Sequence, residues 1–329
     1  MNWSGKRVLV TGAGGFIGSH LVEKLVGLGA EVKGFVKYNS RSEWGYLDGM
    51  SKETKAGMSI FAGDLKDADA VRNSTEDIDL IFHLGALISI PYSYVNPRDS
   101  IETNILGTLN VLIAAREHEV EKVIHTSTSE VYGTAKYVPI DEEHPLQGQS
   151  PYSASKIGAD KIAESFYSSY DLPVAIIRPF NTYGPRQSAR AVVPTIITQA
   201  LTKNEVRLGA LHPTRDLTYV SDVVEAFVKI AESKKCVGEV VNVGSNFEIS
   251  IAKLAEKIIS LTGKNVKVKQ DPKRLRPEKS EVERLWCNNK KAKKLLGWEP
   301  KVSLNEGLKR TMKWISENLD YYKPGMYAI

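Results

Sequence analysis

The chain has 329 residues, of which 42% are hydrophobic and 25% are charged, with 25 glycines, 14 prolines and a formal net charge of +5. This composition is typical of a globular protein with one large domain or two moderate ones, and it excludes collagenous and disordered classes. No apolar run reaches the roughly 18 residues of a membrane span, and the first residues carry no secretory signal. We therefore expect a cytoplasmic protein without a membrane-spanning segment.

The first half of the chain alternates short apolar runs with amphipathic stretches, the pattern of βαβ units around a parallel sheet. Six apolar runs are predicted as strands: residues 7–10, 31–36, 58–61, 80–83, 122–126 and 174–177. Three amphipathic stretches are predicted as helices: residues 16–28, 101–117 and 153–170. After Arg178, prolines and glycines crowd together and indicate a domain crossing. Beyond it we expect a helix at 195–201, a strand at 240–243, a mostly helical chain from Ile249 and a final helix over 304–318.

The basic excess, 44 basic against 39 acidic residues, lies largely between Lys264 and Arg310. Aromatic side chains that would stack on bases are not interleaved there, so we expect no nucleic-acid partner. The excess fits a solvated helix face or the attraction of an anionic small molecule. Two cysteines, Cys236 and Cys287, are too few for a disulfide framework. Three histidines have no matched second ligand, so no metal is expected: His83, His125 and His212.

A glycine-rich turn follows the first predicted strand and opens the first predicted helix. Gly12, Gly15 and Gly18 supply a tight turn, a close approach for a pyrophosphate and close packing of the helix. Phosphates would lie at the helix N-terminus, where free N–H groups and the helix dipole favour negative charge. The sequence therefore predicts a dinucleotide-binding site here.

The Gly-x-x-Gly-x-x-Gly spacing resembles that of the extended short-chain dehydrogenase/reductases that act on nucleotide sugars. Further matches run along the chain: Gly63-Asp64-Leu65, His83-Leu84-Gly85-Ala86, Asn104 with Gly107-Thr108, Tyr152-x-x-x-Lys156, Arg178-Pro179-Phe180-Asn181, Arg215-Asp216 and Leu296-Gly297-Trp298. The chain is most similar to bacterial NAD-dependent sugar dehydratases of the legionaminic and pseudaminic acid pathways. The resemblance implies a Rossmann-type, doubly wound parallel α/β sheet with a smaller, mostly helical substrate-binding domain.

The cofactor implied by the resemblance is NAD, with NADP as the alternative. An acidic residue at the end of the second strand usually binds the ribose diol of NAD. Here that place is near Val36 and is followed by Lys37 and Arg41, cations that could meet the 2′-phosphate of NADP. Beside the glycines, Lys37 and Arg41, the resemblance implies these cofactor-binding positions: Phe16, Ile17, Asp64 near the adenine, Leu65, Ala86 near the nicotinamide ribose, Tyr152 and Lys156.

Tyr152 and Lys156 are four residues apart and share one face of a predicted helix. An ammonium beside a phenol lowers the pKa of the phenol toward the working range of a base. The resemblance implies that Tyr152 removes the proton of a sugar hydroxyl as hydride passes to the nicotinamide. It also implies that Lys156 holds the nicotinamide ribose.

The fifth predicted strand runs into Thr128, Ser129 and Glu130, and the side-chain period of two directs Thr128 and Glu130 to the same side. The resemblance implies that Glu130 takes the C5 proton, because dehydratases carry a Glu here and simple 4-epimerases do not. Ser129 departs from the Asp of dTDP-glucose dehydratases, whereas GDP-mannose dehydratases share the Thr-Ser-Glu order. Delivery of the proton to the departing C6 hydroxyl by Ser129, Tyr152 or Glu130 stays open.

The substrate-binding positions also come from the resemblance. Guanidinium groups suit bidentate contacts to a diphosphate, and a Tyr-Ser pair is expected to face the sugar. The positions are Tyr92, Ser93, Asn181, Arg186, Arg215, Arg276 and Arg284.

These residues predict a nucleotide-sugar 4,6-dehydratase, or an allied dehydratase/isomerase, for a UDP- or GDP-linked N-acetylhexosamine of bacterial surface or flagellar sugars. A 4-epimerase and a non-catalytic dinucleotide sensor are the alternatives. Residues 1–178 plus 216–244 are expected to bind the dinucleotide, and residues 179–215 plus 245–329 the substrate. The predicted helices at 101–117 and 153–170 match those that pair in family dimers, so we expect a homodimer. The aromatic tail, 321–327, either docks on the body or frays.

Overall fold

The computed structural model describes residues 1–322, so the predicted aromatic tail lies outside the described residues beyond Tyr322. A parallel seven-stranded sheet forms the centre, in the order β10-β6-β5-β4-β1-β2-β3. Its strands are β1 (Arg7–Thr11), β2 (Glu31–Lys37), β3 (Met58–Gly63), β4 (Leu80–His83), β5 (Lys122–Thr126), β6 (Val174–Pro179) and β10 (Val240–Val243). The predicted Rossmann-type fold class is confirmed.

Helices cover both faces of this sheet because successive strand residues bury their side chains on opposite sides. On one face pack α1 (Phe16–Gly27) and α9 (Val220–Glu232). On the other pack α3 (Ala68–Thr75), α6 (Gly107–Glu117) and α7 (Pro151–Tyr170). Short helices complete this part: α2 (Lys52–Ala56) beside β3, and α4 (Ile90–Val95) and α5 (Pro97–Ile101) after β4.

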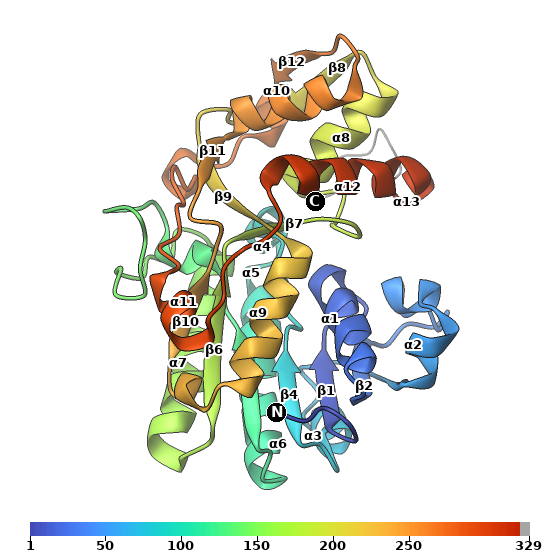
Figure 1. Ribbon diagram of the computed structural model, residues 1–329. Coiled ribbons are helices and arrows are strands. Elements are labelled where there is room, and N and C mark those ends of the chain that lie inside the picture. The colour runs from blue at the N-terminus through green and yellow to red at the C-terminus, as the bar shows by residue number, and fades with distance from the viewer. Residues whose placement is uncertain (323–329) are drawn as a thin grey trace.

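A second group of elements lies above the carboxyl ends of the large sheet, as Figure 1 shows. It contains a three-stranded sheet of β7 (Asn181–Tyr183), β9 (Thr214–Tyr219) and β11 (Glu248–Ser250) and a two-stranded sheet of β8 (Glu205–Leu208) and β12 (Lys267–Gln270). Its helices are α8 (Val192–Thr202), α10 (Ile251–Thr262), α12 (Leu304–Glu317) and α13 (Leu319–Tyr322). In contrast, α11 (Lys290–Leu296) packs beside β10 of the large sheet.

Two sequence predictions about secondary structure need correction. The helix expected over 101–117 is interrupted by a π-helical turn at Glu102–Leu106, between α5 and α6. Within this turn the amide of Asn104 bonds to the backbone of Leu87 and to Ser155 Oγ, at 2.8–3.0 Å. The region after Ile249 is less helical than expected, because β11 and β12 pair with the distant strands β9 and β8.

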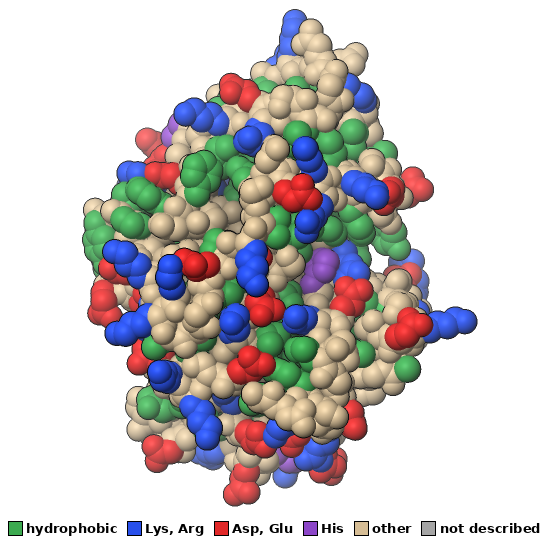
Figure 2. All heavy atoms as spheres, viewed as in Figure 1, with side chains coloured by type: hydrophobic (Ala, Val, Ile, Leu, Met, Phe, Trp, Pro, Cys, Tyr) green, Lys and Arg blue, Asp and Glu red, His purple; other side chains and the backbone are tan. Residues whose placement is uncertain are grey.

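The parallel arrangement places the carboxyl ends of β1, β4, β5 and β6 at one edge, facing the second group of elements (Figure 1). Ligands of open α/β sheets bind at this edge. Within residues 1–322, no helix is long and apolar enough to cross a membrane. On the face drawn in Figure 2, Lys and Arg side chains are interspersed with Asp and Glu and do not form a continuous basic patch.

Candidate active site

A cavity of about 960 Å³ opens at the carboxyl edge of the sheet. It extends from the glycine turn after β1, past the ends of β4 and β5, to the loop around Arg276 in the second group of elements. This volume is at the upper end of the range for small-molecule sites. Six basic and three acidic side chains line the cavity, so its wall carries a surplus of positive charge.

The glycine turn forms a cradle without side chains. Gly12 has a φ of +70°, and a Cβ on Gly18 would overlap the carbonyl oxygen of Gly12. A Cβ on Gly14 would overlap the carbonyl oxygen of Trp44. Gly15 is the N-cap of α1 and provides no side-chain cap, so the first N–H groups of the helix lack an intrahelical partner. The cradle therefore fits the pyrophosphate of a dinucleotide, and Phe16, Ile17 and Ala86 line the same cavity.

Of the cations predicted to contact the adenosine half, only Lys37 lines the cavity. Its Nζ lies 3.9 Å from Asp64, whereas Arg41 is exposed and lies 3.6 Å from Glu43. Neither Arg41 nor Asp64 lines the cavity. Leu65 is buried in the core and would meet a Cβ placed on Gly85 or Gly107, so it supports the site from beneath instead of lining it.

Tyr152 enters the cavity from the first turn of α7. Ser150 and Ser153 form a capping box that fixes the start of this helix. Burial raises the pKa of Tyr152, against a hydrogen bond with Thr128 that lowers it, and the charge of Glu130 raises it further. The pKa lowering expected from the sequence is therefore not found, because burial outweighs the stabilisation of a phenolate here.

Lys156 lies one turn further along α7 and is only 4% exposed. Burial lowers the pKa of its ammonium to about 8, and the negative charge of Asp160 opposes this shift. Lys156 does not line the cavity itself but lies beneath its wall. The residue spacing of 152, 156 and 160 places three polar groups on one face of α7, a signal from which Asp160 could have been found.

Asp160 is the centre of a buried polar network. Its carboxylate accepts hydrogen bonds from His125 Nε2 at 3.2 Å, Ser127 Oγ at 2.6 Å and Arg178 Nη2 at 2.9 Å. Burial by itself would raise the pKa of Asp160, but the hydrogen bond from His125 and the charge of Arg178 outweigh it and lower the pKa to about 2. Asp160 is therefore a permanent anion beside Lys156.

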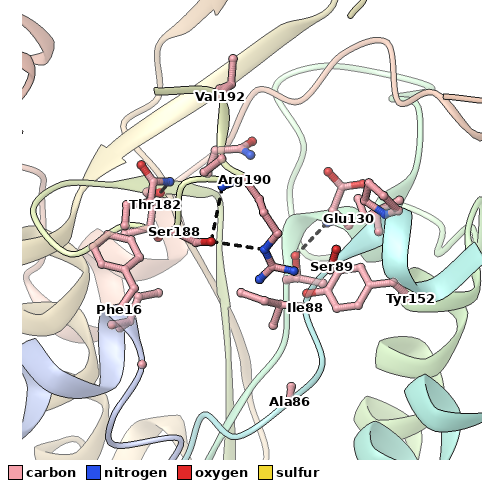
Figure 3. A pocket seen from close by; sticks show the side chains of 18 of the residues that line it. Phe16, Ala86, Ile88, Ser89, Glu130, Tyr152, Thr182, Ser188, Arg190 and Val192 are labelled. Carbon is pink, nitrogen blue, oxygen red and sulfur yellow. Dashed lines mark hydrogen bonds between the residues drawn. The ribbon is translucent and has the colours of Figure 1, made fainter. Parts of the chain in front are cut away.

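Glu130 follows β5 in a short 3₁₀ turn capped by Thr128, whose Oγ1 accepts from the backbone N–H of Glu130 at 3.2 Å. Glu130 is 9% exposed and lines the cavity together with Thr128 and Ser129. Figure 3 shows Glu130 and Tyr152 on the same side of the pocket. The structure therefore brings a carboxylate, a hydroxyl and a phenol together at one end of the cavity.

Three of the predicted substrate-binding residues line the cavity: Asn181, Arg215 and Arg276. The two guanidinium groups share one carboxylate. Arg215 Nη2 donates to Glu281 Oε1 at 3.2 Å, and Arg276 Nη1 donates to the same oxygen at 3.5 Å. Glu281 also lines the cavity, and sequence reasoning did not select it.

The structure places the other four predicted substrate-binding residues away from the cavity wall. Arg186 forms a bidentate ion pair with Glu23 of α1, at 2.7 and 2.9 Å. Arg284 pairs with Glu248. The remaining two are held within their own turn: Tyr92 Oη donates to Asp99 at 2.9 Å, and Ser93 Oγ donates to the Ile90 carbonyl at 2.7 Å.

Comparison with known proteins agrees with this fold and site, which define an extended short-chain dehydrogenase/reductase of the nucleotide-sugar dehydratase and epimerase group. The family model described as GDP-mannose 4,6 dehydratase matches residues 9–311, and the chain belongs to that family.

The similar proteins include both dehydratases and epimerases. The dTDP-D-glucose 4,6-dehydratase of Homo sapiens is 34% identical, over 97% of this chain and 92% of that protein. The UDP-glucose 4-epimerase of Mycolicibacterium smegmatis is 35% identical, over 94% of this chain and 98% of that protein.

Two solved structures bear on the cofactor. One is a UDP-glucuronic acid 4-epimerase from Bacillus cereus in complex with UDP-glucuronic acid and NAD; it has a TM-score of 0.86 and 29% identity, covering 95% of this chain and 99% of that chain. The other is TunA, an NAD-dependent NDP-hexosamine 5,6-dehydratase involved in tunicamycin biosynthesis, with a TM-score of 0.83 and 28% identity, covering 95% and 98%. Both support the preference for NAD over NADP.

Proposed function

We propose that the protein is an NAD-dependent nucleotide-sugar 4,6-dehydratase or an allied dehydratase/isomerase. The single observation that carries the proposal is Glu130, a carboxylate on the cavity wall beside Tyr152. A sugar that is only oxidised and reduced at C4 needs no base at C5, whereas loss of water from C5 and C6 does. The dehydratases among the similar proteins support the same interpretation.

NAD is the cofactor in this proposal because the glycine cradle, Ala86 and Tyr152 line one cavity that suits it. When bound, the nicotinamide would accept hydride from C4 of the sugar and later return it, so no net NADH accumulates. Tyr152 would take the proton of the C4 hydroxyl, with its oxygen held by the hydrogen bond to Thr128. Lys156 would orient the ribose and supply positive charge beneath Tyr152.

Glu130 would then collect the C5 proton, which becomes acidic once C4 is a ketone because the carbanion is delocalised as an enolate. The departing C6 hydroxyl needs a proton, and three groups stand at this end of the cavity: Ser129, Tyr152 and the protonated Glu130. Ser129 is a far weaker acid than a carboxyl group. We therefore assign proton delivery to Glu130 or Tyr152, with Ser129 as a hydrogen-bonding neighbour.

For the substrate we propose a UDP- or GDP-linked N-acetylhexosamine used for bacterial surface or flagellar sugars, in a pathway like those of legionaminic and pseudaminic acid. The similarity to a dehydratase of NDP-hexosamines supports an amino sugar. The test is to incubate the purified protein with UDP-, GDP- and dTDP-linked sugars and follow the reaction by NMR. A new C6 methyl signal is expected with an N-acetylhexosamine.

A UDP-sugar 4-epimerase is the second candidate. It is favoured by Ser129, which gives this chain no acidic residue between Thr128 and Glu130, and by the similarity to a UDP-glucose 4-epimerase. The same NMR experiment separates the two functions, because an epimerase product keeps its C6 hydroxyl and inverts at C4. Steady formation of NADH in step with product would contradict both.

We also propose a cytoplasmic homodimer in which α7 and the segment from α5 to α6 pair with the same elements of a second copy. Ile101 and Leu106 on this segment are exposed although both are large and apolar, which supports an interface there. The division into residues 1–178 plus 216–244 and residues 179–215 plus 245–329 remains a prediction.

A further inference from the structure

A cation that no sequence motif indicated lines the cavity between the two groups of elements. Arg190 belongs to the loop between β7 and α8, and its Nε and backbone N–H both donate to Ser188 Oγ, at 3.2 and 3.4 Å. Figure 3 shows its side chain extending into the pocket, toward the loop that carries Ile88 and Ser89. The contact with Ser188 fixes the stem of the side chain and leaves the terminal nitrogens directed into the cavity.

The terminal nitrogens of Arg190 have no protein partner among residues 1–322: neither an ion pair nor a hydrogen bond to Nη1 or Nη2 is present. Other arginines of this region differ. Arg186 is neutralised by Glu23, and Arg215 and Arg276 are both neutralised by Glu281. Burial lowers the pKa of Arg190, and no acidic group acts against that shift.

A guanidinium partly withdrawn from water without a counter-charge is costly, and the cost is removed when an anion binds. The planar fork of a guanidinium matches the paired oxygens of a phosphate. The surplus of basic over acidic side chains along the wall also favours an anionic ligand. Phosphate is therefore the chemistry that Arg190 is built to bind.

We propose that Arg190 binds the diphosphate of the nucleotide sugar, in the place that sequence reasoning gave to Arg186. The inference rests on the proposed function, because it requires a nucleotide-sugar ligand. The pyrophosphate of the dinucleotide is the other source of phosphate, but it has its own cradle at Gly15, at the start of α1. Arg190 instead directly precedes α8, which belongs to the second group of elements.

The test measures binding without turnover. UDP, dTDP and uridine are titrated by calorimetry into the protein saturated with NAD, and NAD is titrated separately. The variants are Arg190→Gln, Arg190→Lys and the surface control Arg72→Gln. Loss of a charge-assisted hydrogen bond pair weakens binding about 10- to 100-fold. We expect this loss for UDP and dTDP in Arg190→Gln, a smaller loss in Arg190→Lys, and none for uridine, NAD or the control.

Three results would overturn the proposal: unchanged UDP and dTDP affinity in Arg190→Gln, a loss confined to NAD, or a loss seen for UDP-glucuronate but not for UDP. The last would mean that the guanidinium reads a carboxylate on the sugar. Failure of the wild type to bind UDP, dTDP or GDP would overturn both this inference and the proposed function. Binding through Arg190 without a C6 methyl product would overturn the dehydratase assignment alone.

Discussion

Two carboxylates near Tyr152 differ in their surroundings, and this difference separates their roles. Glu130 faces the cavity, and its backbone N–H is held by Thr128. Asp160 is fully enclosed and accepts hydrogen bonds from three side chains. A base must reach the substrate and exchange its proton, whereas a fixed charge must do neither. Glu130 suits the first task and Asp160 the second, which is to hold charge beside Lys156.

Replacing Glu130 with Gln keeps its size and removes the base. General-base assistance contributes about 100- to 10,000-fold to rate. We expect C4 oxidation to survive, while loss of C6 water and deuterium uptake at C5 fall by a factor in that range, measured by NMR in deuterated buffer. The exposed Glu53 offers a matched control, and Glu53→Gln should leave both rates unchanged. An unchanged dehydration rate in Glu130→Gln would refute the assigned role.

Asp160→Asn should lower stability and move the pH profile of the enzyme. The variant leaves Arg178 buried without its counter-charge, which costs about 3–5 kcal/mol at pH 7. The native pKa of Asp160 is lowered to about 2 from 3.8, so its stabilisation is present above pH 3.8 and is lost as the pH falls through 2. Urea unfolding at pH 7 and pH 3 should therefore show a smaller difference from wild type at the lower pH.

The same variant tests the link to Lys156. Asp160 raises the pKa of Lys156, which burial lowers to about 8. Without that anion the ammonium should lose its proton at a lower pH, so activity that depends on it should decline at a lower pH than in wild type. A variant that is less stable but has an unmoved high-pH limb would mean that Asp160 is structural only.

At this scale the sequence predicted residue types better than side-chain directions. Tyr152 and Glu130 could be found because each lies at a fixed distance from a strand end or helix start. Arg186 and Arg190 differ by four positions in one loop, yet the first pairs with Glu23 and the second enters the cavity. That choice depends on the position of α1 across the molecule, which local sequence does not encode.

At the scale of elements, the buried strands of the large sheet were predictable because they are continuous apolar runs. The predicted bounds of β4, β5 and β10 agree with the structure. The short strands β7, β8, β9, β11 and β12 were missed because their partners are distant in the chain. Their pairing depends on tertiary contacts more than on local propensity. This matters for function, since β7 and β9 carry Asn181 and Arg215 into the cavity.

Gly18 and Gly27 provide a test of the glycine cradle within a single helix. A Cβ on Gly18 would overlap the Gly12 carbonyl, whereas nothing lies within 4 Å of a Cβ on Gly27. Gly18→Ala should cost about 1–3 kcal/mol through the displaced turn and weaken NAD binding at least about 10-fold. Gly27→Ala should raise stability by about 0.5–1 kcal/mol and leave NAD binding unchanged. Thermal unfolding and NAD titration check both, and equal effects of the two variants would contradict the cradle.

At the scale of the whole molecule, the cavity is formed by both groups of elements. The large sheet contributes the glycine turn, Glu130 and Tyr152, and the upper elements contribute Arg190, Arg215 and Arg276. Closure of the two groups around bound ligands would bring the cationic side to the sugar nucleotide while the cofactor rests on the sheet. This division explains why the catalytic groups lie early in the chain and the phosphate-binding candidates follow Arg178.

The apolar surface on the segment from α5 to α6 gives the last prediction, the homodimer. Ile101 and Leu106 are 44% and 48% exposed, and α7 packs alongside this segment. Large apolar side chains grouped on one face favour burial against a second copy, because a two-fold interface uses the same patch twice. Leu106→Arg would place a charge at the centre of that contact.

We expect the wild type to sediment at twice the mass of the 36.4 kDa chain at micromolar concentration, and Leu106→Arg to sediment as a monomer. Phe247→Arg is the matched control, since Phe247 is 56% exposed and lies in the loop before β11, away from this face. It should remain dimeric. Because the π-helical turn at Glu102–Leu106 also holds Asn104 against Leu87 beside the cavity, the monomeric variant should lose NAD affinity as well. A wild type that sediments as a monomer, or a Leu106→Arg variant that stays dimeric, would exclude this interface.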